Sequence, residues 1–240
     1  MTPDTLMAVM EATWPPAASW VVGPWRLRDG AGGGKRVSAA SVEGDWTPAD
    51  ITPADITPAD IILAEQAMAQ PLFMIRPQDS ALDAALAALG YSVVDPVIVY
   101  ATDTARFAAA PRMATFPHWP PLHIAADLWD AAQIGPARRA VMQRALGPKT
   151  VILARTADRA VGVAFVALHG PVAMLHALEV SPSHRRQGTA RNILHAAAVW
   201  ARDHGAETLA LAVTRANTAA CALYASQGML GVGQYHYRQK

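Results

Sequence analysis

The sequence contains very little cysteine and very little net charge. Cys221 is the single cysteine among 240 residues, so no disulfide bond can form within the chain. Twenty Lys and Arg face 19 Asp and Glu, which leaves a formal net charge of +1. A chain so close to neutrality has no general attraction to polyanions, and we therefore expect no nucleic-acid partner.

Long apolar runs and targeting signals are also missing. No apolar run approaches the roughly 18 residues that a membrane span needs, so we expect no membrane partner. The first residues include Asp4 and no basic segment, unlike a secretory signal, and a cytoplasmic location is the expectation. His118 and His123 are five residues apart, which differs from the spacing of ligands on one helix face. We expect no metal.

What the chain does have is apolar content. Hydrophobic residues make up 52% of the sequence and charged residues 16%, enough to bury a sizeable core. The length is compatible with one large domain or two small ones.

One stretch combines an apolar strand, a basic turn and the start of an Ala-rich helix. The strand is expected over Val172–Val180, and the turn follows it. The first N–H groups of a helix lack partners within the helix, and the helix dipole adds positive charge there. Arg185 and Arg186 supply full charges, while Gly188 and Ala190 allow close approach to the backbone. The stretch therefore predicts a binding site for a phosphate-like anion.

The pattern Arg185-x-x-Gly188-x-Ala190 after a hydrophobic strand is similar to the acyl-CoA signature of the GNAT superfamily of N-acetyltransferases, R/Q-x-x-G-x-G/A. A second segment agrees with it. The segment from Asn217 to Met229 resembles the family's N-x-x-A-x-x-L-Y-x-x-x-G-F motif, with Met229 in place of the usual aromatic residue.

The resemblance covers residues 111–240 and implies a GNAT-like α/β (α+β) fold, in which helices flank a mixed central sheet. Residues 1–110 lack the acyl-CoA motif and are expected to form an N-terminal α/β domain. Their order of strand, helix and strand echoes that of residues 209–237, so a degenerate half of the same fold is one interpretation. Residues 103–121 are rich in Pro, Ala and Thr and are expected to be a linker.

Within the first part, two strands are expected at Trp20–Arg28 and Lys35–Val42, joined by a glycine-rich turn. The phrase Thr-Pro-Ala-Asp-Ile then occurs three times in tandem between Thr47 and Ile61. Each copy looks like a helix start, but a proline every five residues prevents one continuous helix. We expect the last copy, at Thr57, to begin a helix and the earlier copies to form an extended surface insertion.

The resemblance implies direct transfer of an acetyl group from acetyl-CoA to a primary amine in a ternary complex. In the family a tyrosine protonates the departing thiolate, and Tyr224 matches it; a phenol with a pKa of about 10 is protonated at neutral pH. Plain packing is the alternative for Tyr224. Some members use a strand glutamate as the base, which matches Glu179, and a salt bridge to Arg185 or Arg186 is the alternative. By strand alternation, His176 and Glu179 are expected on opposite faces, with His176 a hydrogen-bonded core residue.

The resemblance also implies which residues bind acetyl-CoA. They are Leu178, Val180, Arg185, Arg186, Gln187, Gly188, Thr189, Ala190, Arg191 and Asn217. Backbone groups of residues 178–180 would hold the pantetheine and the thioester oxygen beside a partner strand at residues 209–213. Asn217 would either cap its helix or approach the pantetheine arm.

Two alternatives remain open on the function. The chain could instead be a non-catalytic acyl-CoA-binding or assembly module whose acceptor cleft is occupied by the N-terminal half. The acceptor could be an amino acid, a peptide amino terminus, a lysine side chain, a polyamine or an aminoglycoside. No acidic cluster marks a site for cationic small molecules, which disfavours the last two. Family members often dimerise, so a homodimer is a further expectation.

Overall fold

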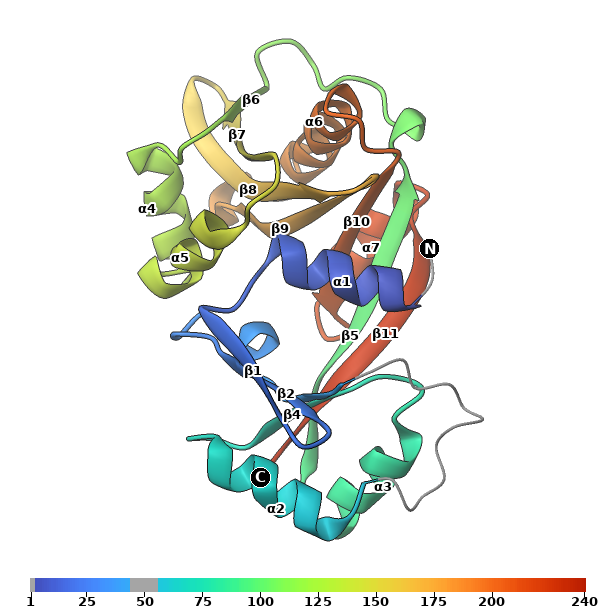
Figure 1. The fold of residues 1–240 in the computed structure, drawn as a ribbon. Coiled ribbons are helices and arrows are strands. Elements are labelled where there is room, and N and C mark those ends of the chain that lie inside the picture. Colours follow the sequence, from blue (N-terminus) through green and yellow to red (C-terminus); the bar gives the residue numbers. More distant parts are fainter. Residues whose placement is uncertain (1–2, 44–55) are drawn as a thin grey trace.

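The computed structural model describes residues 3–43 and 56–240. A mixed sheet of eight strands, in the order β4-β11-β5-β10-β9-β8-β7-β6, runs through the molecule (Figure 1). Its strands are β4 (Leu72–Ile75), β5 (Ser92–Asp103), β6 (Thr115–His118), β7 (Lys149–Thr156), β8 (Arg159–His169), β9 (Val172–Val180), β10 (Thr208–Thr214) and β11 (Leu230–Gln239). Neighbouring strands pair antiparallel except β9 and β10, which are parallel.

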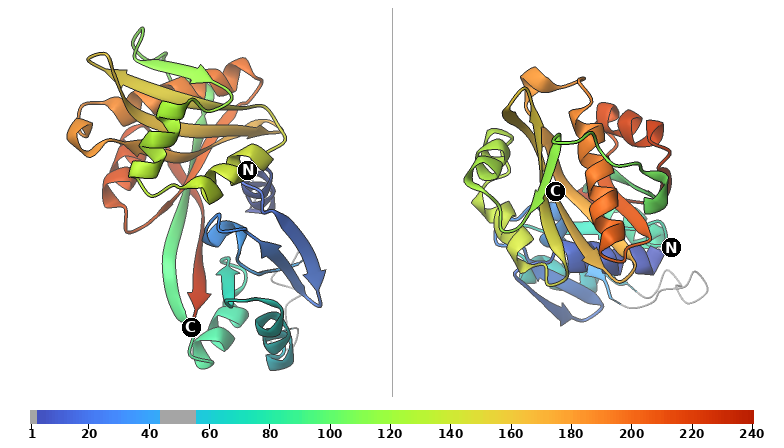
Figure 2. Two further views of the ribbon diagram at one scale, coloured as in Figure 1. Left: turned by 90° about the vertical axis from the view of Figure 1, so that its left-hand side faces the viewer. Right: turned by 90° about the horizontal axis from the view of Figure 1, so that it is seen from above.

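Helices cover both faces of this sheet, as the two views in Figure 2 show. The helices are α1 (Pro3–Thr13), α2 (Pro58–Ala67), α3 (Ser80–Ala88), α4 (His123–Ala131), α5 (Pro136–Arg144), α6 (Thr189–Asp203) and α7 (Thr218–Ser226). Helices α6 and α7 pack on one face in the largest core cluster, and α1, α4 and α5 pack on the other. Because both faces are covered, β8 is almost continuously buried rather than alternating.

Helix α6 shows how the sequence produces this packing. Ile193, Leu194, Ala197, Ala198 and Ala201 recur at helical spacing and are all fully buried against the sheet. Small alanine side chains let the helix backbone lie close to the strands. The position of α6 matters because only the short segment 181–188 separates its first turn from β9.

The first part of the chain does not form a separate large sheet, because its strands β4 and β5 belong to the eight-stranded sheet. Strands β5 and β11 extend beyond the central sheet to a lower module that contains β4, α2 and α3 (Figure 1). A small sheet of β1 (Ala18–Val22), β2 (Trp25–Asp29) and β3 (Ser41–Val42) completes this module. Trp25, Phe73 and Tyr91 pack together in its core.

The main sheet crosses the division that the sequence suggested near residue 110. Strand β5 lies between β10 and β11, so residues 1–110 supply two strands of the sheet that residues 111–240 build. A degenerate N-terminal copy of the same fold is therefore not confirmed.

Several local expectations need correction. The strand expected over Trp20–Arg28 is broken by a turn at Gly23, which has a positive φ of 55° and is followed by Pro24, so it forms the β1–β2 hairpin. The strand expected from Lys35 begins instead as a 3-10 turn, η1 (Lys35–Val37). Strand β6 lies within the expected linker and pairs with β7.

The helix start at Thr57 is confirmed. The Thr57 hydroxyl accepts a hydrogen bond from the Asp60 N–H, and the Asp60 carboxylate accepts one from the Thr57 N–H, which is a capping box. The two earlier copies of the repeat, from Thr47 to Ile56, fall almost wholly outside the described residues.

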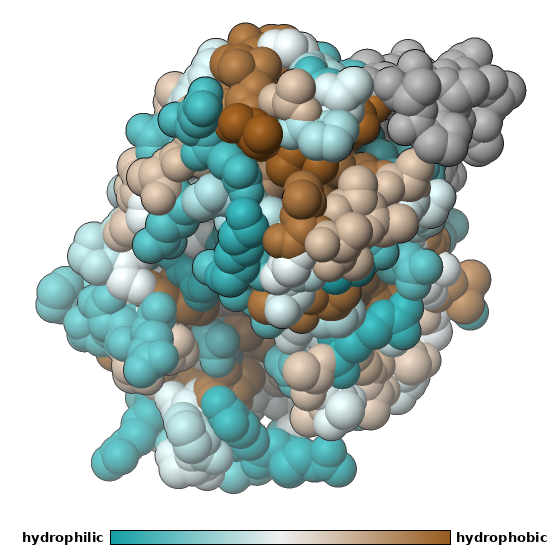
Figure 3. Space-filling model, turned by 90° about the horizontal axis from the view of Figure 1, so that it is seen from below, coloured by the Kyte–Doolittle hydropathy of each residue, from teal (hydrophilic) through white to brown (hydrophobic). Residues whose placement is uncertain are grey.

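The underside of the molecule, seen in Figure 3, mixes apolar and polar surface. The lower module exposes several large apolar side chains, namely Trp20, Val21, Ile62, Leu63, Leu89 and Val93. No helix in residues 3–43 or 56–240 has both the length and the apolar character needed to cross a membrane.

Candidate active site

The site is built where the parallel strands β9 and β10 part. Their pairing runs from Val172 opposite Thr208 to Leu175 opposite Leu211. Beyond that point, residues 176–179 of β9 and 211–214 of β10 line a cavity of about 400 Å³. Strands that stop pairing leave backbone N–H and C=O groups that a ligand can satisfy.

A bulge in β9 shapes one wall of this cavity. Val163 of β8 lies opposite Glu179 and Phe165 lies opposite His176, so one β8 residue faces two residues of β9. Ala177 adopts a left-handed conformation, with φ of 50°. The Ala177 carbonyl accepts a hydrogen bond of 2.9 Å from the indole Nε1 of Trp129. A side chain of α4 thus holds the bulge in place.

The bulge corrects the expectation that His176 and Glu179 face opposite ways. In a regular strand, residues three apart lie on opposite faces. The extra residue at the bulge shifts this alternation, and both His176 and Glu179 line the same cavity.

The turn between β9 and α6 presents backbone donors. A short 3-10 helix, η3 (Pro182–His184), is followed by Arg186 with φ of 62° and Gly188 with φ of 83°, the N-cap of α6. The N–H groups of residues 186–191 meet no acceptor within the described part of the chain. Arg185 donates from Nε to the Val180 carbonyl at 3.1 Å, which fixes its side chain beside the end of β9. This arrangement suits an anion.

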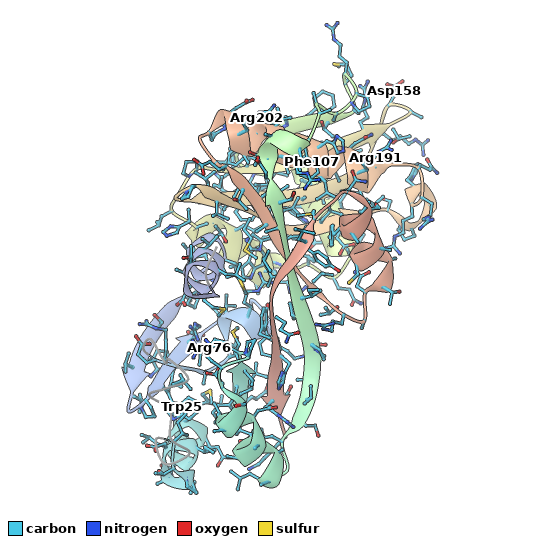
Figure 4. The ribbon with its side chains drawn as sticks, turned by 90° about the vertical axis from the view of Figure 1, so that its right-hand side faces the viewer. Trp25, Arg76, Phe107, Asp158, Arg191 and Arg202 are labelled. Atoms are coloured by element: carbon cyan, nitrogen blue, oxygen red, sulfur yellow. The ribbon has the colours of Figure 1, made fainter. Side chains whose placement is uncertain are left out.

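The other residues expected to bind the cofactor are distributed around the cavity and the turn. Leu178 lines the cavity, and Val180 is buried beneath the turn. Gln187 and Arg191 are exposed, whereas Thr189 is buried at the first position of α6. Arg191 lies near the beginning of this helix and Arg202 near its end (Figure 4).

Asn217 fits both roles that the sequence left open. Its side-chain oxygen accepts a hydrogen bond of 3.1 Å from the Ala220 N–H, so it caps α7. Asn217 also lines the cavity.

Tyr224 lies on α7, is 6% exposed and lines the cavity. Its ring packs against Tyr100, but its hydroxyl makes no hydrogen bond to any described residue. Burial raises the pKa of Tyr224, with further upward contributions from Cys221 and Glu179. The phenol therefore keeps its proton at neutral pH and remains able to donate it.

Glu179 is half-buried on the cavity wall and forms no ion pair within 4 Å among the residues placed by the structure. The expected alternative, a salt bridge to Arg185 or Arg186, is therefore not formed. Burial raises the pKa of Glu179, and Arg185 and Arg138 offset part of that rise. A carboxylate with a raised pKa is a stronger base than an exposed one.

His176 is a buried, hydrogen-bonded core residue, which confirms that interpretation. Thr13 donates its hydroxyl proton to the Val9 carbonyl at 2.7 Å, so its oxygen accepts from His176 Nε2 at 3.0 Å. His176 Nδ1 then accepts from Arg36 Nη1 at 3.1 Å. Burial and the Arg36 charge hold the pKa of His176 well below its usual range, so the imidazole is neutral.

The cavity reaches through the sheet. Tyr224 belongs to the core cluster on the α6 and α7 face, whereas Trp14 belongs to a cluster on the opposite face. Several cavity residues that lie far from the motifs in sequence were not predicted, among them Trp14, Lys35, Arg36, Asp95, Tyr235 and Tyr237. No local motif marks them, because only the tertiary fold brings α1, η1 and β11 to this point.

No cluster of His, Cys, Asp and Glu suited to a metal ion occurs among the residues that the structure describes. The phenol of Tyr224 and the carboxylate of Glu179 line one cavity, and the turn that presents N–H groups free of acceptors within the described chain follows β9 at residues 181–188.

Residues 116–229 match the model of the acetyltransferase (GNAT) family, so the chain contains a GNAT-family acetyltransferase domain. This match supports an acyl-transfer function.

Relatives extend the likeness over nearly the whole chain. A protein of Bacillus subtilis (strain 168), described as "Uncharacterized N-acetyltransferase YobR", is 23% identical over 240 residues, covering 95% of each chain. A GCN5-related N-acetyltransferase from Kribbella flavida has a similar fold, with a TM-score of 0.74, 17% identity and coverage of 98% of this chain and 94% of that one. A functionally unknown conserved protein from Staphylococcus epidermidis ATCC 12228 has a TM-score of 0.65 and 13% identity, with 94% of each chain covered. The shared fold therefore includes the lower module.

The bulge should loosen when its indole donor is removed. Trp129→Phe keeps an aromatic ring but leaves the Ala177 carbonyl without that donor, so we expect a loss of about 1–3 kcal/mol of unfolding free energy and faster amide hydrogen exchange at Leu178 and Glu179. Trp25→Phe is the matched control, since Trp25 Nε1 donates to the Asp60 carbonyl at 2.8 Å in the lower module, far from the turn (Figure 4). Unchanged exchange at Leu178 and Glu179 in Trp129→Phe would show that the indole does not hold the bulge.

Proposed function

We propose that this protein is an N-acetyltransferase that transfers the acetyl group of acetyl-CoA directly to a primary amine of a small molecule or peptide in a ternary complex. The observation that carries the proposal is a single cavity through the sheet, with the Tyr224 hydroxyl and the Glu179 carboxylate both without hydrogen-bonding partners among the described residues. This is the pair of proton-transfer groups that amine acylation needs.

The cofactor would lie along the turn and the gap between β9 and β10. Its diphosphate would accept hydrogen bonds from the N–H groups of residues 186–191, with Arg185 and Arg186 beside them. The pantetheine arm would pair with the backbone of residues 176–179 where β10 no longer does. Asn217 lies at this gap and would contact the arm while it caps α7.

The chemistry follows from this placement. Glu179, directly or through a water, takes a proton from the acceptor ammonium or from the amine as it attacks. The amine nitrogen forms a bond to the thioester carbonyl carbon, the carbon–sulfur bond breaks, and Tyr224 gives its proton to the departing thiolate. Cys221 does not line the cavity, which favours direct transfer over an acyl-cysteine intermediate.

The rival interpretation was a binding module whose acceptor cleft is filled by the first part of the chain. Trp14 and residues 33–36 line the cavity, yet about 400 Å³ remains between them and β9. Space for an acceptor favours an enzyme. A cytoplasmic location and a homodimer remain expectations from the sequence and the family resemblance.

Cofactor binding depends on the turn at Gly188. Gly188→Glu places a negative side chain beside the diphosphate site, and we expect the affinity for acetyl-CoA in calorimetry to fall at least about tenfold. Gly205→Glu is the matched control, because Gly205 also has a positive φ (87°), lies at the far end of α6 and has open space around it. Equal acetyl-CoA affinities in the two variants would remove the proposed cofactor site.

Tyr224→Phe should leave the fold and cofactor binding intact, because the lost hydroxyl has no partner among the described residues. We expect kcat, measured as thiol release from acetyl-CoA over a panel of amines, to fall by about 100-fold. Tyr100→Phe removes a neighbouring phenol that does not line the cavity and should retain activity. If wild type and Tyr224→Phe release thiol at one background rate while CoA still binds, the module interpretation is correct.

The pH dependence should report Glu179. A protonated carboxyl cannot accept a proton, so kcat/KM should fall as pH drops through the pKa of Glu179, which burial raises above the ordinary glutamate value of 4.5. Glu179→Gln should remove this acidic limb and lower kcat by about 100-fold. Glu207→Gln alters an exposed glutamate outside the cavity and should keep the wild-type profile. If the fall of kcat/KM at low pH is unchanged in Glu179→Gln, another residue is the base.

A further inference from the structure

Arg36 is a cation on the cavity wall without a carboxylate partner. It belongs to η1, just after the glycine-rich turn, and its Nη1 donates to His176. Its Nε is closed off from solvent and has no hydrogen-bond partner among residues 3–43 and 56–240. None of the described carboxylates lies within 4 Å of its guanidinium. Arg36 as a whole is partly exposed, but a shielded guanidinium nitrogen without a partner is costly, so this position calls for a function.

Three other shielded arginines of the same chain are paired with carboxylates, whereas Arg144, like Arg36, has no such partner among the described residues. Arg28 donates to Glu11 at 2.9 Å, Arg76 to Asp79 at 2.9 Å and Arg238 to Asp83 at 2.7 Å. The fold thus supplies carboxylates to these structural arginines. Arg36 differs from them because it faces a cavity, where a ligand can supply the missing negative charge.

Tyr235 provides a second, independent observation. It is 4% exposed, lines the cavity, and its hydroxyl is buried with no hydrogen-bond partner in the described chain. A buried hydroxyl left without a partner destabilises the fold, and a ligand in the cavity can supply the missing hydrogen bond. Tyr237 lies beside it on the same wall, and burial raises the pKa of Tyr237 well above its usual value. A neutral phenol does not balance the charge of Arg36.

The remaining charges of the cavity leave a positive excess. Lys35 and Asp95 are paired with each other at 2.6 Å. Of the remaining charged side chains that line the cavity, Arg36 and Arg138 are positive and only Glu179 can be negative. The lining therefore attracts an acceptor that carries a negative group.

His176 orients the guanidinium of Arg36. Its Nδ1 accepts from Nη1 of Arg36 and its Nε2 donates to Thr13, so the imidazole fixes one nitrogen of the guanidinium. The opposite edge of a guanidinium, formed by Nε and Nη2, is the two-donor fork that matches a carboxylate. Nε has no hydrogen-bond partner within the described chain, and the polar side chains that neighbour the guanidinium there besides His176 are those of Tyr235 and Tyr237, which, against the opposing effect of burial, raise the pKa of Arg36.

We propose that the acceptor is a small amino carboxylic acid, whose carboxylate is bound by Arg36 and the Tyr235 hydroxyl while its amine meets the thioester between Glu179 and Tyr224. The proposal rests on the proposed acetyl transfer and names its substrate class. A cavity of about 400 Å³ that also admits the thioester leaves room for a single amino acid rather than a large acceptor. In the reaction the amine loses its proton to Glu179 and the carboxylate stays ionised on Arg36.

The test compares amino acids with their carboxamides, which keep the amine and lose the charge. With acetyl-CoA, wild type should show a kcat/KM about 10- to 100-fold higher for the acids, as expected for a charge-assisted hydrogen bond. Arg36→Met should abolish this preference. Arg144→Met is the matched control, because Arg144 also has a buried nitrogen without a partner in the described chain but does not line the cavity. Equal use of acids and amides by wild type would overturn the proposal.

A second measurement separates this proposal from acetyl transfer itself. Calorimetry with N-acetylamino acids and their amides reports carboxylate binding without turnover, and wild type should bind the acids about 10- to 100-fold more tightly. Tyr235→Phe removes a hydroxyl with no described partner, so it should fold normally and lose part of this difference even if Arg36→Met is unstable. Carboxylate binding without acetyl-CoA binding would refute the transferase and keep the anion site. Acetyl-CoA turnover with no preference for carboxylates would refute the anion site and keep the transferase.

Discussion

The site depends on the loss of pairing between β9 and β10 after Leu175 and Leu211. A parallel pair that continued would close the sheet and leave no passage between its faces. The bulge at Ala177 turns β9 away, and the Trp129 indole satisfies the carbonyl that the bulge frees. A helix on one face thus keeps open a gap that the helix on the other face, α7, uses to present Tyr224.

The gap is closed on its far side by segments that lie at opposite ends of the sequence. Strand β5 fits between β10 and β11, which fixes β11 beside the cavity and brings in Tyr235 and Tyr237. Helix α1 and η1 then cover the remaining side with Trp14 and Arg36. The lower module therefore contributes to the site by holding β5, β11 and η1 in register, although it contains none of the acyl-CoA motif.

Local patterns in the sequence were enough for most elements and for one side of the site. Strand β10 occurs over the expected residues, and the turn before α6 follows from helix-start chemistry that a few residues encode. The break at Gly23 and the left-handed Ala177 were missed, because neither residue type alone requires a turn or a bulge. Arg36 was missed for a different reason: its lack of a counter-ion is a property of long-range packing, which spacing along the chain does not report.

Burial governs the protonation of three groups in the cavity, whereas its two arginines, Arg36 and Arg138, remain charged. Burial shifts the pKa of Tyr224 and of Glu179 upward and that of His176 downward, so each group is pushed toward its neutral form. These shifts suit groups that pass protons. A guanidinium cannot respond in this way, because it keeps its proton at any physiological pH. Arg36 therefore keeps its positive charge in a cavity where Tyr224, Glu179 and His176 are shifted toward their neutral forms. A negatively charged ligand would balance that charge.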